Sequence, residues 1–144
     1  MSQIERITAA GQLVPLTFHQ NAVAASQTNV QLALVETSAT TSTTDNTEYL
    51  MPFDGEIVAI SAALSAAATA GSLTVGATVG GTEGTDPTLS ITTATEARDT
   101  AVRGTARFSA GDLIGAEITS SGTWDATTAD LVVVVWVLVT LEGI

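Results

Sequence analysis

The sequence is poor in several residue types on which catalytic and binding sites depend. Its 144 residues include no cysteine and a single histidine, and aromatic residues make up 4%. Without cysteine there is no disulfide bond, thiolate zinc site or cysteine nucleophile. Lysine is absent as well, so four arginines stand against 15 acidic residues, and the formal net charge is −11.

This charge balance argues against binding to nucleic acid. A strongly acidic chain repels phosphate unless it also carries a basic patch. The one basic cluster, Arg98, Arg103 and Arg107, is interleaved with Glu96 and Asp99. Such a mixed cluster does not form a basic groove, and we expect no nucleic-acid partner.

Long apolar runs are also missing. The longest, Leu131 to Val139, has nine residues between Asp130 and Glu142, whereas a membrane-spanning helix needs about 20. The N-terminal residues include Glu5 and Arg6 and lack the apolar stretch of a signal peptide. We therefore expect no membrane partner and no export sequence.

Groups that carry chemistry are sparse and unpatterned. His19 is the only histidine and no G-x-S-x-G motif accompanies it, so a Ser-His-Asp arrangement is not indicated. Asp125 with Asp130, or Glu83 with Asp86, could offer oxygens to Ca²⁺, but the EF-hand loop pattern is missing. A pair of carboxylates for glycoside hydrolysis is not excluded by number, although no spacing singles one out. We predict no enzyme activity, cofactor or metal site.

Short alternating segments predict an all-β fold. The clearest alternation runs from Ser72 to Val79 and ends at Gly80-Gly81, a hairpin-type turn. The charged stretch from Glu96 to Asp99 is predicted to connect two further strands. The other predicted strands are residues 30–35, 57–64, 88–93, 101–108, 113–119 and 130–141. With turn signals between them and no amphipathic helix, these strands predict an antiparallel β-sandwich or jelly roll.

Two segments lack a sustained period. Residues 1–29 predict an extended N-terminal arm with a short extended piece from Val14 to Phe18. Residues 30–144 then form the sandwich domain. Within it, residues 37–48 are mostly threonine, serine and other small or polar residues and predict a flexible loop.

The final strand is apolar on both faces. Its odd positions from Leu131 to Val139 are leucine and valine, and its even positions are valine, leucine and Trp136. One exposed face of this kind would leave a contiguous apolar patch of the size that marks a contact. We predict that a second subunit or the arm covers it; the alternative is coverage by loops of the same chain. The candidate subunit-interface residues are Val133, Val135, Trp136 and Val137.

Two arginines are further candidates for that interface. Arg103 and Arg107 share strand parity, which predicts that both guanidinium groups lie on one face. In so acidic a protein they could pair with carboxylates across a subunit boundary, where forked arginine pairing is favoured. The alternative is a pair of solvated surface residues.

Four segments, in this order, resemble the β-sandwich domain of tailed-phage head decoration and head-fibre proteins. They begin with Met-Pro-Phe-Asp-Gly-Glu-Ile-Val-Ala-Ile-Ser at residues 51–61 and continue through residues 69–75, 108–115 and 128–133. The resemblance implies a homotrimer on the outer surface of an icosahedral virion, bound to the major capsid protein after synthesis in the host cytoplasm. It also implies that a terminal arm makes part of the attachment.

The arm and the loops supply the residues for two functional hypotheses. Leu13, Val14, Leu16 and Phe18 could add a strand to a sheet edge of the capsid. The alternative function is a head-fibre or receptor-binding module that recognises a host glycan. The loop aromatics Trp124, Tyr49 and Phe53 are its candidate contacts.

Overall fold

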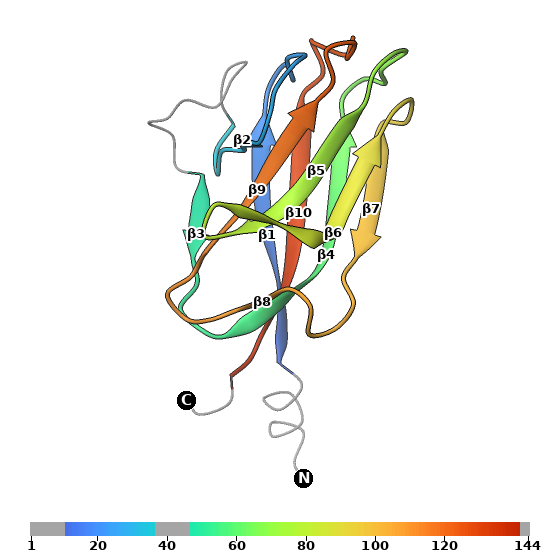
Figure 1. Cartoon of the computed structure of the whole chain (residues 1–144). Helices are drawn as coiled ribbons and strands as arrows, with labels where there is room; N and C mark the ends of the chain where they lie inside the picture. Colours follow the sequence, from blue (N-terminus) through green and yellow to red (C-terminus); the bar gives the residue numbers. More distant parts are fainter. Residues whose placement is uncertain (1–10, 37–46, 142–144) are drawn as a thin grey trace.

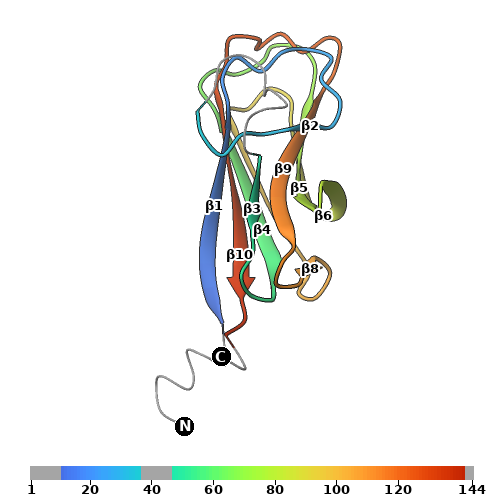
Figure 2. The same cartoon turned by 90° about the vertical axis from the view of Figure 1, so that its left-hand side faces the viewer.

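The molecule consists of two packed β-sheets (Figures 1 and 2). The computed structural model describes residues 11–36 and 47–141, which contain ten strands and no helix. Each sheet has five strands, and all pairings between these strands are antiparallel. The predicted all-β antiparallel sandwich is confirmed.

Sheet A places the first and last of these strands side by side. Its order is β1 (Gln12–Gln20), β10 (Leu131–Val139), β4 (Gly55–Leu64) and β7 (Glu96–Thr100), and β8 (Arg107–Phe108) pairs with the start of β4. β10 therefore lies inside the sheet, between β1 and β4.

Sheet B is built around β9. Its order is β2 (Val30–Gln31), β9 (Leu113–Ser120), β5 (Leu73–Val79) and β6 (Thr82–Ile91), and β3 (Glu48–Leu50) also pairs with β9. β5 and β6 are joined at Gly80 and Gly81, which have φ values of +61° and +75°. The predicted hairpin turn is thus confirmed, and it needs glycine because L side chains rarely adopt positive φ.

The core lies between the sheets and follows the alternation of the strands. In β10 the odd-numbered residues from Leu131 to Val139 are buried, whereas Val132 and Trp136 point away from the core and are exposed. Sheet B contributes fully buried residues from β5 and β9, namely Leu73, Val75, Ile114 and Ile118.

The prediction of a separate arm up to residue 29 is wrong for the residues that the structure describes. β1 is an integral strand of sheet A, paired with β10 from Gln12 opposite Val139 to Gln20 opposite Leu131. Residues 1–10 lie outside the described residues. The segment looked isolated because its partner strand is more than 100 residues away in the sequence.

Three strand boundaries also differ from the prediction. The charged stretch predicted as a connection is β7, whose residues Glu96, Arg98 and Thr100 face solvent at the sheet edge. The strand predicted at 101–108 is mostly a loop with Gly104 at φ +85°, and just its last two residues form β8. β6 begins at Thr82 rather than at residue 88.

The first part of the sandwich domain was overpredicted as well. Of the strand predicted at 30–35, β2 keeps two residues, and Ala33 then forms an isolated bridge with His19. Most of the predicted loop at 37–48 lies outside the described residues, and β3 begins at Glu48.

Candidate functional site

The outer face of sheet A carries several exposed apolar side chains. We use this name for the side chains of β1, β10, β4 and β7 that point away from the core. Its central residues are Leu13, Pro15, Val132, Val134, Trp136, Leu138, Ala59 and Ala63. Leu13 is 57% exposed, Val132 39% and Trp136 38%. Exposed apolar residues gathered on one face are typical of a contact surface.

A groove crosses this face above β4. Its floor includes the small residues Ser61 and Ala63, and β10 forms one wall with Val132 and Val134. The other wall is β7 with Glu96 and Arg98, and the groove has a volume of about 590 Å³. Small side chains on β4 between longer ones on both neighbours create this hollow.

The charges on and beside the face are balanced. Glu56 and Glu96 carry two negative charges, and Arg98 and Arg103 carry two positive ones. The whole chain, by contrast, has a net charge of −11. This surface can therefore approach another acidic molecule with little charge repulsion.

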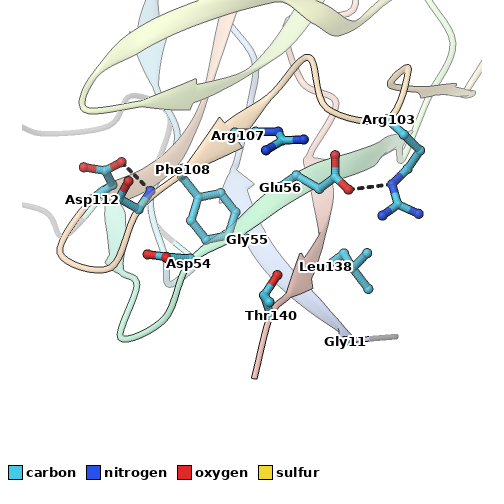
Figure 3. Close-up of a pocket in the computed structure, with 11 residues that line it drawn as sticks. Gly11, Asp54, Gly55, Glu56, Arg103, Arg107, Phe108, Asp112, Leu138 and Thr140 are labelled. Carbon is cyan, nitrogen blue, oxygen red and sulfur yellow. Dashed lines mark hydrogen bonds and ion pairs between the residues drawn. The ribbon is translucent and has the colours of Figure 1, made fainter. Parts of the chain in front are cut away.

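A polar pocket of about 560 Å³ adjoins one end of the face (Figure 3). Arg103 pairs with Oε1 of Glu56, and the Gly104 N–H donates to Oε2 at 2.6 Å. Burial by itself would raise the pKa of Glu56, but these hydrogen bonds and the nearby arginines hold it below its usual value. Arg107 points into the same pocket and makes no ion pair with another described residue.

The other carboxylates of this pocket are committed to turns. Asp54 accepts a hydrogen bond from the Ala110 N–H, and Asp112 accepts one from the Ser109 N–H, each at 2.8 Å. These two hydrogen bonds stabilise the turn that follows β8.

The predicted role of the two arginines is partly corrected by this geometry. They do not share the face of one strand, because Arg103 lies in the loop before β8. They nevertheless line the same pocket. Arg103 pairs within the chain, so the described residues already supply the carboxylate that was expected from a second subunit.

Three of the four predicted interface residues of β10 are also corrected. Val133, Val135 and Val137 are fully buried in the core between the sheets and cannot touch a partner. Trp136 has the opposite parity and lies on the outer face of sheet A. The sequence showed that both faces are apolar, but only the pairing of β10 with β1 and β4 assigns each residue to a face.

The predicted capsid-contact residues separate in the same way. Leu16 is 6% exposed and Phe18 fully buried, because both point into the core from β1. Val14 is half-buried against the core. Leu13 alone of the four projects from the outer face of sheet A, and it remains available for contact.

The opposite surface of the sandwich carries an acidic cluster that the sequence did not reveal. Glu48, Glu83 and Glu117 line one pocket on the outside of sheet B together with Gln31. Gln31 donates a hydrogen bond to Glu117 at 3.2 Å, and the Glu83 carboxyl lies over Gly76 beside it. Because these residues are far apart in the sequence, no local pattern could predict the cluster.

The Glu117 carboxyl is the most perturbed acid of the cluster. Its residue is 5% exposed, and this burial, with the hydrogen bond and charge of Glu83 acting in the same direction, raises its pKa to about 7. Gln31 opposes the shift. The protonated form of the Glu117 carboxyl is therefore favoured in the folded protein.

The loop aromatics offer little to a glycan. Trp124 is 2% exposed and donates a hydrogen bond to the Val23 carbonyl, and Tyr49 packs edge-on against Phe18. Phe53 is 38% exposed. Sugar binding usually needs exposed aromatic rings, and of these three residues Phe53 alone is exposed.

Two of the four acids weighed as calcium ligands, Asp125 and Asp130, hold the backbone instead, and Glu83 lies in the acidic cluster of sheet B. Asp125 accepts hydrogen bonds from the Thr69 hydroxyl and from the Ala70 and Thr69 N–H groups, which together lower its pKa. Asp130 accepts a hydrogen bond from the Ala22 N–H. Among the described residues no group of three acidic or histidine side chains is placed to hold a metal ion. That part of the chain also contains no helix long and apolar enough to cross a membrane.

Comparisons with known proteins do not identify the chain. No protein-family model matches it, and a search of curated proteins finds no match.

Proposed function

We propose that the protein is a structural virion protein that decorates and stabilises the outer surface of an icosahedral phage capsid as an oligomer. Its partners would be the major capsid protein and further copies of the chain. The observation that carries this proposal is the outer face of sheet A, which is apolar, exposed and charge-balanced on an otherwise acidic molecule.

The face gives such a protein a means of attachment. Several modest contacts made at once by an oligomer add up to tight binding without any one of them being strong. The acidic outside of sheet B carries the three glutamates of the cluster described above. Phosphate is repelled by such a surface, which suits a protein on the outside of a particle filled with DNA.

The four segments that resemble phage decoration proteins support the same proposal. Attachment, however, is now assigned to the outer face of sheet A and not to Leu16 and Phe18, which are buried. The resemblance implies a trimer, so light scattering on the purified chain is expected to give three times the mass of one chain.

Particle occupancy tests the proposal directly. Virions of the phage that encodes the chain should carry it on their outer surface, visible as an added layer by electron microscopy. Replacing Leu13 or Trp136 by aspartate should lower occupancy at least about tenfold, because a charge on a desolvated contact is costly. Val35→Asp is the matched control, since Val35 is 62% exposed but lies outside this face. Absence of the chain from the particles would reject the proposal.

A further inference from the structure

The outer face of sheet A carries both an exposed indole and a hollow. Trp136 is 38% exposed on β10, and the groove lies above Ser61 and Ala63 of β4. We propose that Trp136 of one copy of this chain inserts into the groove above Ala63 of a second copy. The inference rests on the assembly role proposed above and specifies its contact.

The indole of the same copy does not line its own groove, and the far end of the groove lies beyond its reach. Trp136 pairs with Ala59, whereas Ala63 pairs with Val132, four residues further along both strands. At about 3.3 Å per residue the two positions are roughly 13 Å apart, farther than an indole side chain extends. The space above Ala63 is therefore left for a side chain from another molecule.

The groove has the chemistry of an indole site. Val132 and Val134 provide an apolar wall, Ala63 leaves open space above the floor, and a volume of about 590 Å³ admits a large side chain. Arg98 stands on the opposite wall, where its guanidinium can lie over an aromatic ring. Tryptophan paired with arginine at the centre of a contact is a common source of binding energy.

Charge favours a second copy as the source of that indole. Two chains of net charge −11 repel each other over most orientations. On and beside the outer face of sheet A, two acids (Glu56 and Glu96) are matched by two arginines (Arg98 and Arg103), so this repulsion is reduced there. Each copy offers one indole and one groove on this face, so identical chains complement each other.

Two single variants and their mixture test the contact. Trp136→Ala removes the indole and keeps the groove, whereas Ala63→Trp fills the groove and keeps the indole. Each variant alone should self-associate at least about 30-fold more weakly than the natural chain, as expected for a residue at the centre of an interface. Mixed together, they should form a complex with each other, because one supplies the indole and the other the groove. Val35→Ala, at a 62% exposed site outside the four strands that form this face, should self-associate normally.

Fluorescence of the natural chain provides a second measurement that does not depend on the folding of either variant. Trp124 is already buried, so a blue shift of the emission with rising concentration would report the burial of Trp136. Trp136→Phe should abolish the shift. Failure of the mixture to associate, or self-association without a shift, would overturn this contact. A chain that still decorates particles in that case would retain the proposed function.

Discussion

Gly71 illustrates how a single residue can be fixed by two constraints at once. Its φ is +86°, and a Cβ at this position would lie 2.4 Å from the backbone N and Cα atoms of Trp124. The neighbouring N–H groups of Thr69 and Ala70 donate to Asp125. Gly71 therefore allows the turn before β5 to pack directly on the loop before β10.

Replacing Gly71 by alanine should be unusually costly. We expect Gly71→Ala to lower the free energy of unfolding by about 3 kcal/mol or more, since backbone strain and a clash with another backbone segment add together. The control is Gly111→Ala, because Gly111 has φ +92° but nothing within 4 Å of the added Cβ. It should cost about 1 kcal/mol from strain alone. Urea denaturation measures both, and equal losses would contradict the role of the contact with Trp124.

At the scale of elements, the acidic cluster links β9 to the hairpin of β5 and β6. The register of the β5–β6 pair shifts at one point: Gly76 of β5 pairs with Thr88, whereas Thr78 pairs with Glu83. The residues of β6 between Glu83 and Thr88 therefore form a bulge. Glu83 then reaches over Gly76 to the carboxyl of Glu117. Glu48, from β3, lines the same pocket and is the other charged group there.

The Glu117 carboxyl beside Glu83 predicts that the free energy of unfolding decreases as the pH rises through neutrality. The pKa of Glu117 is raised from 4.5 to about 7 on folding, so its protonated form is favoured in the folded state. The stability from this group is fully present below about pH 4.5 and is lost as the pH passes about 7. Urea midpoints should therefore be lower at about pH 8 than at about pH 5.

The Glu117→Gln variant isolates the cause of that pH dependence. An amide cannot titrate, so the difference between the two urea midpoints should shrink. Glu96→Gln, at an exposed site on β7, should leave the difference unchanged. A full pH dependence in Glu117→Gln would show that other groups cause it.

The strands that the sequence predicts well are those in which the pattern of apolar and polar residues matches the burial of the strand. β5 and β10 were recognised because alternation or dense β-branched residues reflect burial within the strand itself. β7 was missed because its solvent-facing residues Glu96, Arg98 and Thr100 give an edge strand the composition of a loop. The local pattern of β1 predicts an arm, because its pairing with β10 is non-local and leaves no sign in the neighbouring sequence. The face on which Trp136 lies and the meeting of the three glutamates depend on register, which the sequence does not encode locally.

At the scale of the whole molecule, charge and apolar contact act in opposite directions. The net charge of −11 opposes the approach of two copies, whereas burial of the outer face of sheet A in the proposed contact would favour it. Salt screens the charge repulsion, with a Debye length of about 8 Å at physiological ionic strength, and leaves the apolar contact largely intact.

Self-association should therefore strengthen when salt is raised from about 0.01 M to about 0.15 M. Sedimentation at the two ionic strengths measures this. An interface held mainly by ion pairs of Arg103 or Arg107 would instead weaken with salt. The sign of the salt effect thus distinguishes an apolar contact from an electrostatic one.

The position of β10 also determines when the molecule can fold. It is the last strand of the described chain, yet it lies between β1 and β4, and its odd-numbered residues fill the core. During synthesis β1 is the first of these strands to emerge, and apart from the bridge between His19 and Ala33 it has no partner strand until β10 has left the ribosome. Sheet A can therefore be completed only after the strand pairs of sheet B have become available, although β4 can pair earlier with β7 and β8. The nascent chain exposes the apolar residues of β1 until β10 emerges.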